Sequence, residues 1–462
     1  MNDNKESASS NSSIAVDGSG NFVITWLDNR KTYEGVFRDI FIQRYSNNGT
    51  ALGDNINLNR KITEDYQPPS IASDSTGNFV ITWEENNYIY AQRFSKNGTA
   101  IDSSFKVHNT YTSLSFPLIP SIAMNNSGDF IIVWEGDNIY AQQFSKEGLK
   151  IGNSLKVNDI DVFYSCKPSI CMDKNGNFVI SWASNDYSIY AQRYSSGGTR
   201  LGNNLKVNDT DVSYYTIPSI CSDKNGNFII AWYSGYLNIY AQRYLNDGTA
   251  LGKNFKVNDI DSWYPPISIS SDEIGNYIIS WESRVENISN SNVFAQRYSS
   301  NGEPINKNFI IKSDGSSPDV KLWNGRIYST WTAPDKNNIG ENVYANVIDW
   351  NNPIATSIDE KESKEIPTKF ALSQNYPNPF NPRTTIKYSI PEEVISQKSK
   401  VKNVILKVYD ILGREVAVLV NEVQKPGYYE VEWDASNQPS GVYFYRITTG
   451  NYAATKKMIL IK

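Results

Sequence analysis

The sequence predicts an all-β protein, a seven-bladed β-propeller followed by a small antiparallel β-sandwich. A ten-residue phrase recurs, as DKNGNFVISW at 173–182 and DKNGNFIIAW at 223–232. The tryptophan that ends this phrase occurs seven times in the chain, at steps of 48 to 57 residues. Aromatic residues make up 13% of the 462 residues, as in β-rich proteins, and repeats of about 50 residues are typical of propellers and solenoids. The seven tryptophans are Trp26, Trp83, Trp134, Trp182, Trp232, Trp281 and Trp331.

Each repeat predicts four strands. In the fourth copy Phe178, Ile180 and Trp182 alternate with Val179 and Ser181, which is the period of a β-strand. The phrases KNGN and SGGTRLG favour tight hairpin turns, so successive strands should be antiparallel. Because the second strand is apolar on both faces, each sheet needs neighbours, and a closed ring provides them for every sheet. A linear β-solenoid is the open alternative.

The seventh repeat is degraded. It keeps the glycine turn and Trp331 in PDVKLWNGRIYSTW, but NVYANVIDW stands where other copies have IYAQRYS. Ring closure is therefore expected to be imperfect. The blades run from about Ser12 to about Ser357 in contiguous sequence, and nothing indicates a strand-swapped closing blade.

Charge and composition exclude several function classes. The net charge is −5, divided into −9 over residues 1–369 and +4 over residues 370–462, so the acidic body is poorly suited to nucleic acid. Cys166, Cys171 and Cys221 form no CxxC pair, and the latter two occupy a position held by Ala or Ser in other repeats, which indicates small core residues. No apolar run reaches the roughly 18 residues of a membrane-spanning helix.

Polar residues that recur in most blades are predicted to be structural, because a binding or catalytic residue is needed only once around a ring. The aspartates before the Gly-Asn turns suit Asx-type hydrogen bonds, and the Gln-Arg pairs should link strands or turns. The aspartates are Asp17, Asp74, Asp173, Asp223 and Asp272. The pairs are Gln43/Arg44, Gln92/Arg93, Gln192/Arg193, Gln242/Arg243 and Gln296/Arg297.

Function is expected on one face of the ring, which we call the loop face. It carries the connections between second and third strands, which differ in every copy, together with the blade-to-blade crossovers. The crossovers are aromatic and acidic, which suits sugar rings and their hydroxyl groups, although the same rings would also cap the blade interfaces. The predicted ligand-binding residues are Tyr66, Tyr111, Phe116, Asp161, Tyr164, Asp211, Tyr214, Asp261, Trp263 and Tyr264.

No catalytic residue and no cofactor is predicted, and calcium is the one cofactor left open as an alternative. Three Asn-Asp-x-Asp runs offer the oxygen ligands that Ca²⁺ prefers, without a full calcium-loop signature. They contain Asp159 and Asp161, Asp209 and Asp211, and Asp259 and Asp261. The single histidine, His108, occupies a slot filled by asparagine in other repeats, so it is not expected to act as a base. Two carboxylates in the right spacing would still suffice for glycoside hydrolysis.

The C-terminal region departs from the repeat. The propeller is assigned to residues 1–350, a charged linker to 351–369, and an immunoglobulin-like sandwich to 370–462, where short alternating segments such as YYEVEW and VYFYRI are separated by turns.

This region closely resembles the type A C-terminal sorting domain of type IX secretion substrates, through LSQNYPNPFNP, VYDILGREV, SGVYFYR and the closing KMILIK. The resemblance implies recognition by the type IX secretion machinery, export across the outer membrane, and a preceding export signal that MNDNKESASS does not display. The GNFVxxW and YAQRY phrases resemble repeats of bacterial surface and extracellular proteins.

The predicted function is therefore a secreted or cell-surface protein whose propeller binds a glycan or protein ligand. Two alternatives stay open, a polysaccharide-active glycosidase or lyase and a structural component of a surface layer.

Overall fold

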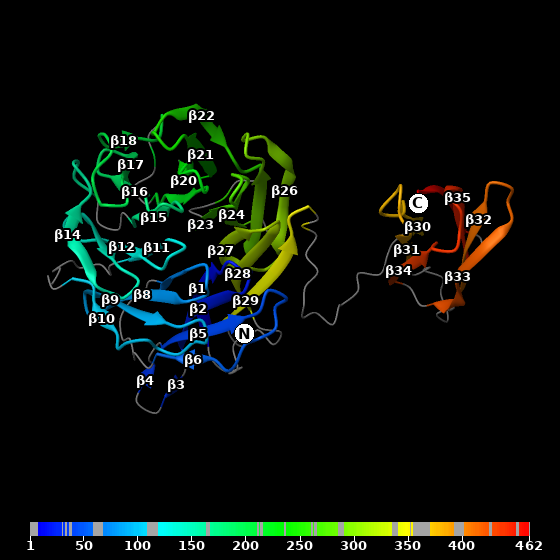
Figure 1. Cartoon of the computed structure of the whole chain (residues 1–462), viewed down its shortest axis with the longest axis horizontal. Helices are drawn as coiled ribbons and strands as arrows, with labels where there is room; N and C mark the ends of the chain where they lie inside the picture. Colours follow the sequence, from blue (N-terminus) through cyan, green and yellow to red (C-terminus); the bar gives the residue numbers. More distant parts are fainter. Residues whose placement is uncertain are drawn as a thin grey trace. The chain divides into compact units, whose positions relative to one another are not determined.

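The computed structural model describes residues 8–29, 31–32, 35–36, 39–58, 68–108, 119–162, 167–209, 212, 216–234, 237–259, 262, 266–284, 291–334, 341–351, 353, 370–391, 402–424, 427–449 and 452–461. The chain divides into two compact units, Met1–Ser357 and Ile358–Lys462 (Figure 1). The described regular elements are β-strands. Across these residues, no helix has the length and apolar character needed to cross a membrane.

The first unit contains seven blades, each an antiparallel sheet of consecutive strands. The first three are β1 (Ala8–Val16), β2 (Phe22–Asn29), β5 (Asp39–Tyr45) and β6 (Ile56–Asn57); β7 (Ser70–Ser73), β8 (Phe79–Glu85), β9 (Tyr88–Phe94) and β10 (Phe105–Lys106); and β11 (Ser121–Met124), β12 (Phe130–Glu135), β13 (Ile139–Phe144) and β14 (Lys150–Lys156). The short strands β3 (Lys31–Thr32) and β4 (Gly35–Val36) form a hairpin in the first blade.

The remaining blades follow the same order. They are β15 (Ser169–Met172), β16 (Phe178–Ser184), β17 (Ser188–Tyr194) and β18 (Leu205–Lys206); β19 (Ser219–Ser222), β20 (Phe228–Ser234), β21 (Asn238–Tyr244) and β22 (Ala250–Lys256); β23 (Ile267–Ser271), β24 (Tyr277–Arg284), β25 (Ser291–Tyr298) and β26 (Pro304–Lys312); and β27 (Ser316–Trp323), β28 (Arg326–Pro334) and β29 (Glu341–Asp349).

Stacked aromatic pairs connect the second and third strands of each blade. In the fourth blade Phe178 stacks on Tyr194 with ring centroids 4.8 Å apart, and Trp182 stacks on Tyr190 at 6.1 Å. Both pairs lie directly opposite in the strand register. The seven repeat tryptophans are at most 6% exposed, so each one forms part of a blade core. The repeated tryptophan is therefore structural.

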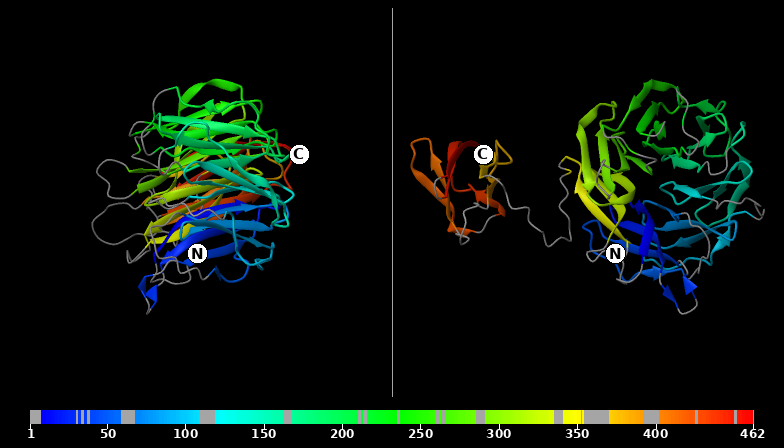
Figure 2. Two further views of the ribbon diagram at one scale, coloured as in Figure 1. Left: turned by 90° about the vertical axis from the view of Figure 1, so that its left-hand side faces the viewer. Right: turned by 180° about the vertical axis from the view of Figure 1, so that it is seen from behind.

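Seven apolar clusters join neighbouring blades, one for each interface. The decisive cluster joins Ile14 and Phe22 of the first blade to Tyr328 and Val343 of the seventh. Figures 1 and 2 show these blades, blue and yellow, side by side. The first unit is therefore a closed β-propeller, as predicted, and the solenoid alternative is excluded.

Polar contacts also close the ring. The carboxylate of Asp319 on β27 accepts hydrogen bonds from the Ser13 hydroxyl at 3.1 Å and the Ile14 amide at 2.9 Å, both in the first blade. It also accepts a 2.6 Å bond from the Ser268 hydroxyl of the sixth blade. The other repeats have serine at the position of Asp319, so one carboxylate joins three blades where the ring closes.

The expectation of four strands in every repeat is wrong for the seventh blade, which has three in the described part of the chain. The physical reason lies in its sequence, which lacks the turn phrase that leads into a fourth strand. After β29 the Trp350 amide instead donates to the carbonyl of Gly325 at 2.8 Å. The degraded copy still closes the ring.

The second unit is a sandwich of two sheets. One contains β30 (Ala371–Leu372), β31 (Arg383–Ile390) and β34 (Gly427–Asp434); the other contains β33 (Glu415–Gln424), β32 (Lys402–Asp410), β35 (Gly441–Thr449) and β36 (Tyr452–Leu460). One apolar core, including Ile386, Leu406, Trp433 and Tyr445, is shared by the two sheets. The predicted linker, 351–369, lies almost entirely outside the described residues.

Candidate functional site

The carboxylates of the turn aspartates are engaged in hydrogen bonds within the turns of the blades. The Asp173 carboxylate accepts the amides of Asn175 at 2.8 Å and Asn177 at 2.9 Å, and the Asn177 side-chain amide at 2.9 Å. Asp17, Asp74, Asp223 and Asp272 make the same three contacts. These bonds hold the turn between first and second strands on the face opposite the loop face, which we call the turn face.

The Gln-Arg pairs are also structural. The Gln192 amide donates to the carbonyls of Arg193 and Gly202, which connects third and fourth strands. The Arg193 guanidinium donates at 2.7 Å to the carbonyl of Asn246 in the next blade. Such a bond crosses all seven interfaces, through Arg44, Arg93, Gln143, Arg193, Arg243, Arg297 and Arg326. Three cavities lie between neighbouring blades beside these side chains.

Replacing Arg193 by alanine is expected to destabilise the propeller by about 1 to 2 kcal/mol, because its guanidinium bonds would be lost at a blade interface. Arg193→Gln should cost much less, since Gln143 makes the equivalent bond naturally, to the carbonyl of Ser196 at 2.9 Å. Urea unfolding followed by tryptophan fluorescence measures both variants. Equal stability of the alanine and wild-type proteins would contradict this interpretation.

The loop face is only partly described. Second-to-third-strand loops and crossovers do meet there, since the Val212 amide donates to the carbonyl of Tyr187 at 3.0 Å and the Asn185 amide to that of Asp161 at 3.2 Å. Asp161, which is exposed, is the one predicted ligand-binding residue that lies in the described part of the chain. The other predicted ligand-binding residues lie outside the described residues; they are Tyr66, Tyr111, Phe116, Tyr164, Asp211, Tyr214, Asp261, Trp263 and Tyr264.

Two charged residues on this face, Glu135 and Lys167, were not identified from sequence. Glu135, at the end of β12, is 3% exposed, and Lys167 lies in the crossover to the fourth blade. Burial lowers the pKa of the Lys167 ammonium, while the Glu135 carboxylate opposes that change.

The aspartates proposed for calcium are partly engaged elsewhere. Asp159 forms an ion pair with Arg200, with its oxygens 2.8 and 2.5 Å from the guanidinium nitrogens. Asp209 and Asp259 are exposed, and Asp211 and Asp261 lie outside the described residues. Within the described part of the chain, no three His, Cys, Asp or Glu side chains are grouped as metal ligands.

His108 and two cysteines are built into the blades. The Ile89 amide donates to Nε2 of His108, just as the Ile139 amide donates to the Asn158 side chain. The histidine therefore accepts the same hydrogen bond as the asparagine at the equivalent position of the next blade. Cys171 and Cys221 are buried and unpaired with each other. Burial raises the pKa of the Cys171 thiol to about 12, which disfavours the reactive thiolate. Cys166 is not among the described residues.

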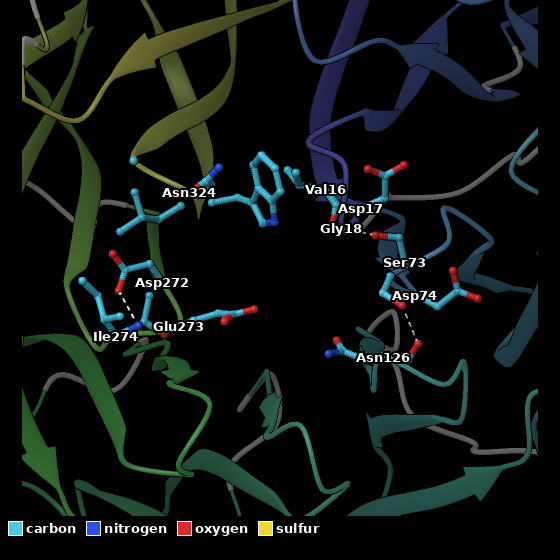
Figure 3. A pocket seen from close by; sticks show the side chains of 15 residues that line it. Val16, Asp17, Gly18, Ser73, Asp74, Asn126, Asp272, Glu273, Ile274 and Asn324 are labelled. Carbon is cyan, nitrogen blue, oxygen red and sulfur yellow. Dashed lines mark hydrogen bonds between the residues drawn. The ribbon is translucent and has the colours of Figure 1, made fainter.

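A cavity that sequence reasoning missed lies at the centre of the ring on the turn face (Figure 3). We call it the axial cavity; it has a volume of about 540 Å³. It is lined by the ends of the innermost strands and the turns that follow them in the first, second, third, sixth and seventh blades. The lining residues are Val16, Asp17, Gly18, Ser73, Asp74, Ser75, Asn126, Ser271, Asp272, Glu273, Ile274, Leu322, Trp323, Asn324 and Gly325.

The variable side chains of the axial cavity follow the structural turn aspartate, which is Asn125 in the third blade, or take its place. Glu273 and Asn126 come from the sixth and third blades and point toward one another across the opening (Figure 3). In the seventh blade a two-residue turn, Asn324 and Gly325 with φ of 45° and 71°, replaces the longer aspartate turn. This places Trp323, half-buried, in the wall. The sequence feature that could have revealed the cavity is the variation at one turn position among otherwise similar repeats. The residues at this position are Gly18, Ser75, Asn126, Lys174, Lys224 and Glu273.

The chain is similar to several solved structures at low identity. An ulvan lyase, from a polysaccharide lyase family, has 10% identity and a TM-score of 0.47, covering 75% of this chain and 94% of its own. A protein of unknown function from Dyadobacter fermentans has 9% identity and a TM-score of 0.44, covering 74% and 95%. The fucose-specific lectin of Aleuria aurantia has 12% identity and a TM-score of 0.41, covering 67% and 95%. No curated protein matches the chain.

The second unit gives a clearer result. Residues 374–462 match the family described as secretion system C-terminal sorting domain. This segment is a type IX secretion sorting domain. The protein is therefore exported, and it is secreted or attached to the outer cell surface.

The sorting domain holds its Asn-Pro-rich segment against its C-terminal strand. The Phe380 amide donates to the carbonyl of Ile459 at 3.0 Å, and the Ile459 amide donates to the Asn378 side chain at 2.9 Å. The buried Tyr445 hydroxyl accepts the Asn375 amide at 2.8 Å and donates to the carbonyl of Ser373 at 2.7 Å. The two ends of the sorting domain therefore depend on each other.

Proposed function

We propose that this protein is an exported binding protein, in which the sorting domain delivers the propeller and the loop face of the propeller binds an extracellular glycan or protein. One observation carries the proposal. The polar residues that recur around the ring are engaged in turns and blade interfaces, as Asp173 and Arg193 illustrate. Recognition is then left to residues that differ between blades, and these are concentrated in the loops and crossovers.

Alanine replacement of Trp263 and Tyr164 is expected to weaken capture of the ligand at least tenfold without unfolding the propeller, because aromatic contacts often dominate binding energy. A glycan array and a pull-down of surface proteins, both with the full chain, identify the ligand, and calorimetry then gives the affinities. A reducing-end assay should detect no product.

The control is Leu149→Ala. This exposed leucine, at 67% exposure, belongs to a third-to-fourth-strand turn outside the loop face, so its replacement should leave binding unchanged. Unchanged binding by the Trp263 and Tyr164 variants, with cooperative melting retained, would reject the loop face as the binding surface.

A further inference from the structure

We infer that the axial cavity is a second binding site, for a saccharide that is uncharged or carries an amino group. It lies on the turn face and is separate from the proposed site on the loop face. Its volume of about 540 Å³ falls within the range of ordinary small-ligand sites. It also combines an aromatic ring with hydrogen-bonding groups, which is the chemistry that sugars require.

The aromatic group is Trp323. An added Cβ on Gly20 would stand 2.6 Å from Cζ3 of this indole, so the first blade packs against the ring at a distance that only glycine allows. The ring is thereby fixed in position, and its remaining surface lines the cavity. A fixed indole can stack on the apolar face of a sugar ring with little loss of side-chain entropy.

The hydrogen-bonding groups are Glu273 and Asn126. Both are exposed and point into the opening from opposite sides (Figure 3). No hydrogen bond or ion pair to another described residue engages either side chain, whereas Asp17, Asp74 and Asp272 in the same wall hold their turns. The carboxylate of Glu273 is available to accept sugar hydroxyls, and the amide of Asn126 both donates and accepts.

Charge sets the specificity. The described lining contains four carboxylates, those of Asp17, Asp74, Asp272 and Glu273, and no lysine or arginine. A cleft lined by one sign of charge repels ligands of that sign. Uronic acids and sulfated sugars are therefore disfavoured, while neutral and amino sugars are accepted.

The test is binding of the full chain to an array of neutral, amino, uronate and sulfated oligosaccharides, followed by calorimetry on the best ligand. Glu273→Gln and Asn126→Ala are each expected to weaken binding of the neutral or amino saccharide about tenfold or more. The first replaces a charged hydrogen-bond acceptor by a neutral amide, and the second removes the amide altogether. Glu273→Gln should also reduce the discrimination against uronates. Both positions are exposed turn residues, so the fold should be retained.

Two controls test whether the effect is local to the cavity. Lys174→Gln and Lys224→Gln change the equivalent turn positions of the fourth and fifth blades, which do not line the cavity. Both should leave binding of this saccharide unchanged. The inference is overturned if no saccharide binds, if uronates bind equally well, or if binding depends on Trp263 and not on Glu273. None of these results decides the proposed function, which is tested separately by the Trp263 and Tyr164 variants of the loop face.

Discussion

Replacing Asp319 by alanine is expected to lower the free energy of unfolding of the propeller by about 3 to 5 kcal/mol, the largest effect of any single polar substitution in the ring. Its side chain is 17% exposed and accepts three hydrogen bonds from two neighbouring blades. Alanine would leave the Ile14 amide without this acceptor where the ring closes. Urea unfolding of the full chain, followed by tryptophan fluorescence, measures the loss.

Two variants control this experiment. Asp319→Ser restores the residue of the other repeats, and the shorter hydroxyl should recover part of the stability. Ser219→Ala changes the equivalent position in the fifth blade and should be nearly neutral. Limited proteolysis adds a local readout, since an opened ring should be cleaved first near β1 and β27. An unfolding curve for Asp319→Ala that matches the wild type would show that the apolar cluster around Phe22 and Tyr328 closes the ring alone.

The propeller was predictable because its signals are local and repeated. The strand alternation in NFVISW, the aspartate turn and the buried tryptophan each occur within ten residues, and the regular spacing of Trp182 and its counterparts makes a ring the simplest way to cover every sheet. The roles of Asp173 and Arg193 followed from the same logic, and their hydrogen bonds agree with it.

What escaped prediction depends on residues that are distant in sequence. Asp319 looks like an ordinary surface aspartate until the fold brings Ser13, 306 residues away, next to it. The axial cavity is assembled from turns of five blades, and each of its side chains alone resembles a solvent-exposed turn residue. Trp323 reaches the wall because the seventh hairpin is shorter than the others, which the count of turn residues alone did not reveal. The aromatic residues of the loop face stay a prediction.

The sorting domain is expected to be indispensable for export. We expect the secretion machinery to recognise the domain in its folded form, in which the Asn-Pro-rich segment is held by the last strand through Phe380 and Ile459. Deleting either the Asn-Pro-rich segment or the last strand therefore removes the hydrogen-bonding partner of the other. The described core of the sorting domain is built from residues of the second unit.

A chain that ends at residue 357 should consequently fold but remain inside the outer membrane, whereas the full chain appears in the medium or on the cell surface. Cell fractionation with immunoblotting gives the distribution, and a cooperative melting transition of the retained propeller separates failed sorting from failed folding. Tyr445→Phe supplies the graded variant. It removes both the donor to the Ser373 carbonyl and the acceptor of the Asn375 amide, so the sorting domain should lose about 1 to 2 kcal/mol and export should fall without stopping. Normal export of the truncated chain would mean that the propeller carries its own export signal.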